Sequence, residues 1–163
     1  MELTKKERLI LANQFRILEQ IDPKEADFYQ KAYTILQKGY ALEYDSLVEW
    51  FHDDLTKEEC REVIEILEMH SRLDYAYRRL GDKTGIDEVR LRFRGFDGNN
   101  ETGQMSYADF LIHREGKWRD FASMDLNSHC PTLDRYRRML GQWRPYVGTL
   151  ELSREDILRI IGE

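Results

Sequence analysis

The segment from Lys57 to Leu80 constrains the fold most strongly, because it reads as one long helix. Thr56 followed by Glu59 has the spacing of a capping box, and Gly81 predicts the end of the helix. Its core positions recur at three- and four-residue intervals, which places them on one helical stripe. These positions are Val63, Ile66, Leu67, His70, Leu73, Tyr77 and Leu80. Packing of this stripe against other elements must hold the helix in place.

Similar signals predict two helices near the start of the chain. Thr4 with Glu7 forms a second capping box, and the helix it opens runs through Ile21. Asp22-Pro23 begins another helix that Gly39 ends, so the two form an antiparallel hairpin. The first helix carries two apolar stripes, which predicts burial on most sides or contact with a second subunit. One stripe has Leu11, Phe15 and Leu18, and the other has Ile10, Ile17 and Ile21.

The rest of the chain predicts shorter helices and a loop. The helices are expected at residues 40–52, 101–115, 132–143 and 153–162, and the loop at 117–131. The expected fold is therefore all-α and multi-helical, with an N-terminal helical hairpin packed on a second helical unit. At most one short extended segment is expected, near residues 89–94. We expect a single domain over residues 1–163, with an acidic half at 1–81 and a loop-containing half at 82–163.

Charge and cysteine content narrow the function classes. Residues 1–71 carry 9 basic and 16 acidic side chains, a net of −7, whereas residues 72–94 carry 7 and 4, a net of +3. The acidic first half argues against general coating of nucleic acid and leaves room for a local basic patch. Cys60 and Cys130 are far apart, which argues against a disulfide framework or a four-thiolate zinc site. We find no membrane-spanning run or signal peptide and expect a cytoplasmic protein.

An alternating arginine row is the main candidate binding site. Arg90, Arg92 and Arg94 alternate with Leu91 and Phe93, and a polar Gly-Asp-Gly-Asn-Asn loop follows. In an extended segment this alternation puts three guanidinium groups on one side. We predict a partner- or anion-binding site at Arg90, Arg92, Arg94 and Asp97. The competing interpretation is a structural edge whose arginines pair with the acidic first half.

The loop after the arginine row also suggests a cation site. Asp97, Asn99 and Glu101 match positions one, three and five of a calcium loop, but Thr102 and Ala108 occupy the positions that need glycine and glutamate. A turn in which Asp97 or Asn99 caps the next helix is the simpler interpretation, and we predict no cofactor and no metal.

Two further hypotheses concern chemistry. A metal-dependent hydrolase or nuclease would use Asp97, Glu101 and His113, whereas adjacent Ser128, His129 and Cys130 are poorly placed to act on one atom. Aromatic and basic residues alternate at 75–79, 135–138 and 143–146, a pattern that RNA-binding surfaces use. Tyr136 and Trp143, however, share a stripe with Leu140, so core packing explains them more simply.

Several segments in order along the chain resemble the YfbU family, a group of small bacterial proteins without an assigned activity. They are residues 7–15 (ERLILANQF), Gly39-Tyr40, residues 64–69 (IEILEM), residues 93–97 (FRGFD), Glu101, residues 136–143 and Leu152-Ser153. The chain departs from the family mainly at 98–102 and 127–131. The resemblance implies an all-helical fold with a hairpin packed on a second helical unit, and it brings no reaction.

The functional expectation is a regulatory or adaptor module that acts through macromolecular binding. We expect a homo-oligomer with an unknown protein partner and no membrane association. The alternatives are the metal-dependent enzyme and an RNA-binding regulator.

Overall fold

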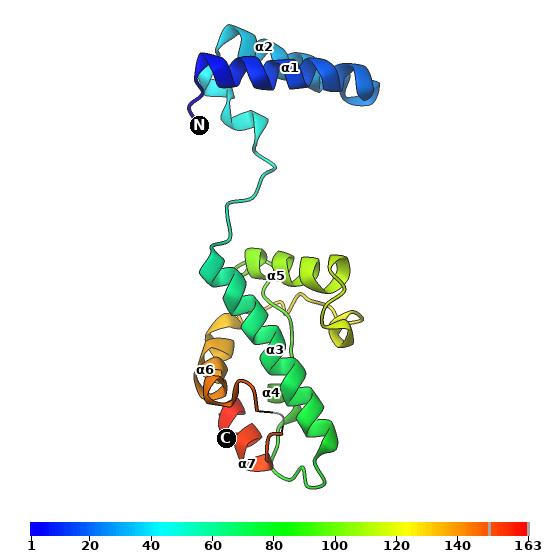
Figure 1. Ribbon diagram of the computed structural model, residues 1–163, viewed down its shortest axis with the longest axis vertical. Coiled ribbons are helices and arrows are strands. Elements are labelled where there is room, and N and C mark those ends of the chain that lie inside the picture. The colour runs from blue at the N-terminus through cyan, green and yellow to red at the C-terminus, as the bar shows by residue number, and fades with distance from the viewer. Residues whose placement is uncertain (150, 163) are drawn as a thin grey trace. The chain divides into compact units, whose positions relative to one another are not determined.

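The computed structural model describes residues 1–149 and 151–162, and the regular elements in that part of the chain are helices (Figure 1). They are α1 (Lys5–Ile21), α2 (Ala26–Lys38), α3 (Lys57–Arg79), α4 (Glu88–Leu91), α5 (Thr102–Asp109), α6 (Leu133–Trp143) and α7 (Arg154–Ile161). The predicted all-α, multi-helical class is confirmed. The chain divides into two compact units, Met1–Asp54 and Leu55–Glu163.

The first unit is the predicted helical hairpin of α1 and α2. The Thr4 hydroxyl accepts a hydrogen bond from the Glu7 N–H, and the Glu7 carboxylate accepts one from the Thr4 N–H, so the capping box is formed. Gly39 ends α2 in the left-handed region, with φ 76°. A small core of Ala12, Ala32, Ile35, Leu36, Tyr44 and Leu47 joins the two helices to the turns that follow.

The predicted helix at 40–52 is wrong. The chain instead forms two 3-10 turns there, Ala41–Glu43 and Asp45–Leu47. Tyr44 and Leu47 are both buried on the hairpin core, at 4% and 7% exposure. Their three-residue separation suits the period of a 3-10 turn, which brings both side chains to the same side.

The second unit is built around α3. Its predicted stripe is confirmed, because Val63, Ile66, Leu67 and Leu73 are fully buried and His70 is 1% exposed. Helices α5, α6 and α7 pack on α3, and their apolar residues complete the core. The capping box of Thr56 and Glu59 is formed, whereas α3 ends at Arg79, two residues before the predicted stop at Gly81.

Two local predictions in this unit need correction. Part of the segment near 89–94 that was expected to be extended instead lies in the helical turn α4 (Glu88–Leu91), because the Asp87 carboxylate accepts the Val89 N–H at 2.8 Å and caps the turn. Residues 101–115 are not one α-helix, since α5 continues into a π-helical turn at Phe110–Arg114. Within the described residues, the only β-type pairing outside the helices is one parallel bridge between Phe96 and Asn127.

Helix α3 packs on the later helices, so it belongs to the unit that begins at Leu55. Two expectations stay predictions. One is a single domain whose two halves meet at residue 81, and the other is the packing of the hairpin on the second unit. None of the helices described is long and apolar enough to cross a bilayer.

Candidate functional site: the arginine segment and the pocket beside it

The three arginines of the predicted row have different surroundings. The Arg92 guanidinium donates to Glu88 at 2.9 Å, and the other Glu88 oxygen accepts the Tyr77 hydroxyl at 2.6 Å. Arg90 lies 3.7 Å from Asp87. Arg94 is exposed, and across residues 1–149 and 151–162 its guanidinium has no hydrogen bond or ion pair. The helical turn α4 thus places the Arg92 guanidinium on Glu88, four residues earlier. Arg94 stays exposed to solvent.

Arg135 joins Arg90 and Arg94, and sequence reasoning did not single it out as part of this site. Its guanidinium donates to the carbonyls of Arg90 and Arg92, at 3.2 and 3.3 Å, and lies over the Tyr136 ring. Partial burial lowers the pKa of Arg135, and the nearby positive charges of Arg94 and Arg90 lower it further. Arg90, Arg94 and Arg135 therefore form a group of mutually repelling charges, which we call the arginine cluster.

Asp97, the fourth predicted site residue, is buried and belongs to its own loop. Its carboxylate accepts hydrogen bonds from the Asn100 amide, at 2.5 Å, and from the Asn99 N–H, at 3.0 Å. These bonds, with Asn100 the larger influence, lower the pKa of Asp97. The loop is the predicted turn, but the predicted cap is wrong, because Glu101 precedes α5 and, within the described residues, no side chain caps that helix.

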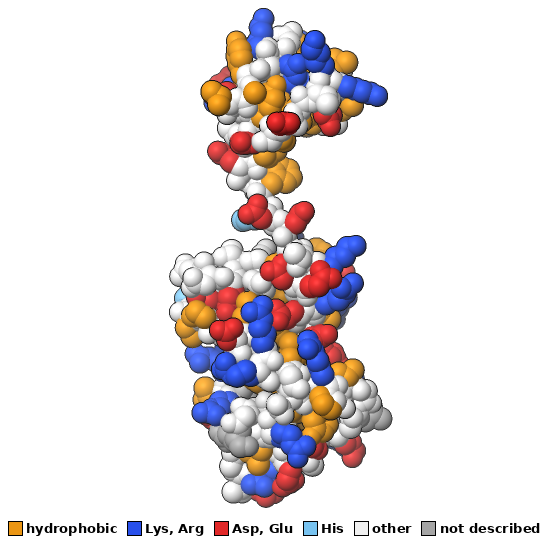
Figure 2. All heavy atoms as spheres, turned by 90° about the vertical axis from the view of Figure 1, so that its left-hand side faces the viewer, with side chains coloured by type: hydrophobic (Ala, Val, Ile, Leu, Met, Phe, Trp, Pro, Cys, Tyr) orange, Lys and Arg blue, Asp and Glu red, His pale blue; other side chains and the backbone are white. Residues whose placement is uncertain are grey.

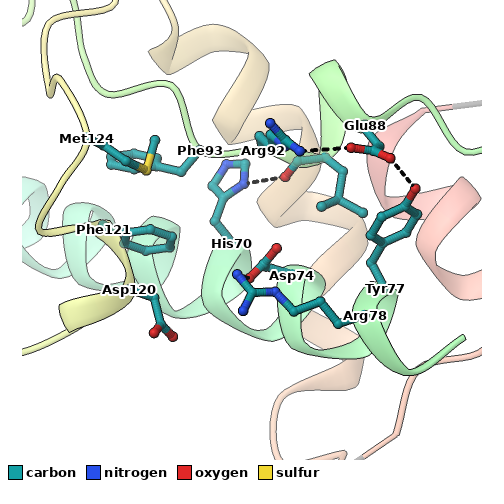
Figure 3. A pocket seen from close by; sticks show the side chains of 11 residues that line it. His70, Asp74, Tyr77, Arg78, Glu88, Arg92, Phe93, Asp120, Phe121 and Met124 are labelled. Carbon is teal, nitrogen blue, oxygen red and sulfur yellow. Dashed lines mark hydrogen bonds and ion pairs between the residues drawn. The ribbon is translucent and has the colours of Figure 1, made fainter.

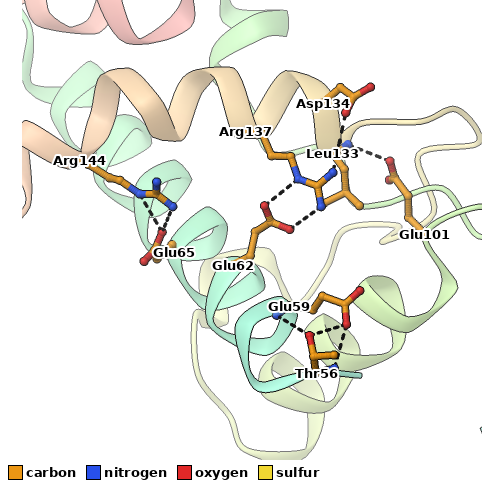
Figure 4. A network of polar contacts seen from close by, with 9 residues as sticks. All are labelled: Thr56, Glu59, Glu62, Glu65, Glu101, Leu133, Asp134, Arg137 and Arg144. Carbon is orange, nitrogen blue, oxygen red and sulfur yellow. Dashed lines mark hydrogen bonds and ion pairs between the residues drawn. The ribbon is translucent and has the colours of Figure 1, made fainter. Parts of the chain in front are cut away.

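The Glu101 side chain joins that loop to the start of α6. Its carboxylate accepts hydrogen bonds from the Thr132 and Leu133 N–H groups, both at 2.8 Å (Figure 4 shows the second). It also accepts the Asp97 N–H and the Thr132 hydroxyl, both at 2.9 Å. All four bonds serve structure, and the carboxylate is 5% exposed.

The residues proposed for metal-dependent chemistry are engaged separately. Nδ1 of His113 lies 2.8 Å from the Asp109 carboxylate, and Nε2 lies 3.1 Å from the Ala122 carbonyl. The Ala122 carbonyl and Asp109 raise the pKa of His113. Among the residues described, no group of three or more histidine, cysteine, aspartate or glutamate side chains is placed to hold a metal ion. The Ser128 hydroxyl donates to the Cys130 carbonyl at 2.7 Å, which occupies its proton.

One aromatic residue from each of two basic–aromatic clusters lies in the core. Tyr136 is fully buried and Trp143 is 4% exposed. Tyr136 donates to the Gly95 carbonyl and accepts the Arg94 N–H, both at 3.0 Å. The core interpretation of their stripe is confirmed, and neither ring has a free face for a nucleotide base.

A pocket of about 340 Å³ lies between α3, the segment from Glu88 to Phe93 and the loop at 120–124 (Figure 3). Sequence reasoning missed it, because its walls come from three separate segments. They are lined by His70, Asp74, Tyr77 and Arg78 of α3, by Glu88, Leu91, Arg92 and Phe93, and by Asp120, Phe121 and Met124. A second hollow of about 400 Å³ shares Asp74, Arg78 and Asp120 with it.

His70 at the inner wall of this pocket has one ring nitrogen without a partner. Nδ1 lies 2.9 Å from the Leu91 carbonyl, which only accepts, so Nδ1 carries the proton. Nε2 is buried and has no hydrogen-bond partner. Burial lowers the pKa of His70 to about 3, which keeps the ring neutral near pH 7. Nε2 is therefore an unused acceptor.

The rim of the pocket is charged, and most of its charges pair with one another. Arg78 and Asp74 form an ion pair at 2.6 Å, and Arg92 pairs with Glu88. Asp120 is exposed and forms no ion pair within the part of the chain that the structure describes. Its loop follows Trp118, which has φ 45°, a left-handed conformation that costs a non-glycine residue about 1–2 kcal/mol.

One comparison with known proteins bears on the whole chain. The family model described as the YfbU domain matches residues 1–162. The match covers both units, including the arginine cluster and the pocket.

Proposed function

Because the chain belongs to the YfbU family, a membership that assigns no reaction, we propose from the structure that it is a cytoplasmic regulatory or adaptor module that works by binding. The proposed contact surface is the arginine cluster of Arg90, Arg94 and Arg135, with Arg92 beside it. The proposed partner is a protein with an acidic surface.

The observation that carries this proposal is the local excess of positive charge. The charges of Arg94 and Arg90 both act against the charge of Arg135, and the Asp87 carboxylate partly offsets them. Like charges held together cost free energy, and an anionic surface brought against them relieves that cost. Guanidinium groups also match carboxylates in geometry, because their N–H groups bind the two oxygens side by side.

An acidic peptide tests the surface directly. A fluorescent oligoglutamate peptide should bind the full chain with an affinity that falls as salt rises, since the contact is ionic. Binding should be lost in the double variant Arg90→Ala plus Arg94→Ala, and circular dichroism should show its fold intact. Arg61→Ala is the matched control, because Arg61 is an exposed arginine on α3 that pairs with Glu58. Unchanged peptide binding in the double variant would show that the surface is wrong.

A single-stranded RNA oligonucleotide serves as the second probe in the same assay. If RNA binds through the same arginines and the peptide does not, the RNA-binding alternative replaces the adaptor proposal. The buried positions of Tyr136 and Trp143 support the protein partner over RNA.

The oligomeric part of the proposal rests on α1. Ile10, Ile17 and Ile21 are 51%, 58% and 72% exposed, and they lie on the side of α1 opposite Ala12, which packs in the hairpin core. Figure 2 shows hydrophobic side chains on the surface of this unit. A stripe of this kind is the face that a helix presents to another helix.

A second copy of α1 fits this stripe when it runs antiparallel. If the two helices cross between Asn13 and Gln14, Ile10 of each copy meets Ile17 of the other, which is the reciprocal contact of a two-fold dimer. The last turn of α1 has no basic residue, and the first turns carry Lys6. Antiparallel pairing therefore brings Lys6 to the negative end of the partner helix.

Native mass spectrometry of the full chain tests the dimer. The wild-type protein should be a multiple of 19.6 kDa, and Ile10→Lys plus Ile17→Lys should give the single subunit. Leu42→Lys is the control, because Leu42 is 96% exposed and lies outside α1. A wild-type protein that is a single subunit would show that another surface, such as the second unit of the same chain, covers the stripe.

A further inference from the structure

The pocket beside His70 has the size and the walls of a small-molecule site. Its volume of about 340 Å³ lies within the usual range for such sites, and its inner wall is made by Leu91, Phe93, Phe121 and Met124. We propose that this pocket binds a small organic cation with an apolar body, of the arylalkylamine kind. The pocket shares Arg92 with the proposed contact surface but contains none of Arg90, Arg94 and Arg135, so the proposal does not depend on the adaptor function.

His70 requires a hydrogen-bond donor in the ligand. Its Nδ1–H is committed to the Leu91 carbonyl, and its neutral Nε2 offers a lone pair that no group uses. Buried polar atoms without a partner are uncommon in native proteins, and each one calls for an explanation. An N–H group in the pocket would supply the missing bond.

The donor reaches Nε2 when a neighbouring side chain moves. Nε2 is shielded from solvent, and Phe121 and Met124 stand beside the imidazole in the pocket (Figure 3). Met124 is half-buried and unbranched, and therefore adjusts at low cost. Its movement connects the open part of the pocket with the histidine.

The charges of the rim select a cation. The lining side chains carry three carboxylates, Asp74, Glu88 and Asp120, against two guanidinium groups, Arg78 and Arg92. Two ion pairs neutralise Arg78 and Arg92 within the rim and leave the charge of Asp120. Asp120 attracts an ammonium group and repels a carboxylate, so an anionic ligand is disfavoured at this position.

The aromatic wall suits the apolar body of such a ligand. The Phe93 and Phe121 rings lie 5.2 Å apart at an angle of 41°, and both line the pocket. Ring faces stack on an aromatic group and also attract a cation. The sulfur of Met124 adds a polarisable contact beside them.

Three probes of similar shape separate charge from shape. They are 2-phenylethylamine, 2-phenylethanol and phenylacetate, titrated into the full chain by isothermal calorimetry. The amine should bind best, the neutral alcohol more weakly, and the anion most weakly. Higher salt should weaken the binding of the amine and leave the binding of the alcohol unchanged, because only the amine is attracted by charge.

Asp120→Asn tests whether the negative charge of the rim attracts the ammonium group that donates to Nε2. The substitution should lower the affinity for the amine by about two- to fivefold, the range of an exposed ion pair, and leave the affinity for the alcohol unchanged. Asp134→Asn is the control, because Asp134 is 91% exposed and does not line the pocket. Both substitutions are at exposed positions, so the fold should tolerate them.

Nitrogen-detected NMR of the histidine rings gives the second readout. Adding the amine should shift the Nε2 resonance of His70 and leave that of His113 in place. The proposal is overturned if phenylacetate binds as tightly as the amine, or if the amine does not bind at millimolar concentration. An unchanged affinity for the amine in the Asp120→Asn variant overturns the proposal as well.

Discussion

Glu101 accepts two hydrogen bonds from Thr132, one from the backbone N–H at 2.8 Å and one from the hydroxyl at 2.9 Å. Thr132 is the residue that precedes α6, where the first backbone N–H groups have no partner within the helix. A carboxylate from 31 residues earlier in the chain supplies that partner, and its charge also suits the positive end of the helix. Glu101 thereby fixes the loop at 97–101 to the start of α6.

Glu101→Ala should strongly destabilise the second unit. The substitution leaves the buried N–H groups of Asp97, Thr132 and Leu133 without their acceptor, so the free energy of unfolding should fall by roughly 3–5 kcal/mol. Urea unfolding followed by circular dichroism measures it. Glu115→Ala removes an exposed glutamate and should change stability by less than about 0.5 kcal/mol. Equal stability of the two variants would mean that Glu101 does not support α6.

Gly95→Ala should also destabilise the fold. Gly95 has φ 79°, and a Cβ there would lie 2.1 Å from the Leu126 carbonyl oxygen. That overlap would disturb the Phe96–Asn127 bridge, and with the left-handed backbone the cost should be about 2–4 kcal/mol. Gly141→Ala is the matched control in α6, where nothing lies within 4 Å of the added Cβ. It should stabilise by about 0.5–1 kcal/mol, because alanine favours a helix. Thermal unfolding of both variants compares them, and a Gly95→Ala protein as stable as wild type would contradict the steric argument.

The parts of the fold that sequence predicted are those with local causes. The capping boxes at Thr4 and Thr56 and the stripe of α3 depend on residues within a few positions of one another. The prediction failed where distant contacts decide. The predicted helix at 40–52 is replaced by 3-10 turns at 41–43 and 45–47, because Tyr44 and Leu47 pack on the hairpin. The alternation at 90–94 reflects the burial of Leu91 and Phe93, and no strand forms there.

The candidate site was predictable only in part for the same reason. Arg90, Arg92 and Arg94 stand out in the sequence, but Arg135 joins them across about 45 residues through the Arg90 carbonyl. His70 was predicted as a core histidine, and it is one. Its bond to Leu91 and the walls at 120–124 exist only in the folded chain, so no sequence pattern indicated the pocket.

His113 should titrate above its ordinary pKa of about 6.5. Both its ring nitrogens face acceptors, the Ala122 carbonyl and the Asp109 carboxylate, so the doubly protonated ring is favoured. A group whose pKa is raised on folding contributes stability below the unfolded pKa, and loses it as pH rises through the folded pKa. An NMR titration of the His113 ring measures the pKa directly, and Asp109→Asn should lower it. A pKa below 6.5 in the wild-type protein would contradict these contacts.

His70 should make the protein less stable as pH falls from 7 to 5. Burial lowers its pKa to about 3, whereas the unfolded chain binds the proton near 6.5. The unfolded state therefore holds more protons between these values, and the contribution of His70 is complete above 6.5 and is lost as pH falls toward 3. From pH 7 to pH 5 this loss is about 2 kcal/mol. Asp97 and Asp156, whose pKa values are lowered, act at lower pH. His113, whose pKa is raised, becomes more stabilising over the same range and offsets part of the loss, so the His70 contribution is the difference in slope between wild type and His70→Phe. Urea unfolding at a series of pH values measures the slope, which should flatten in His70→Phe. If that variant is too unstable to study, the wild-type His70 ring should keep the NMR shifts of a neutral imidazole at pH 5. A protonated ring at pH 5 would mean that the pocket wall around Nε2 admits water.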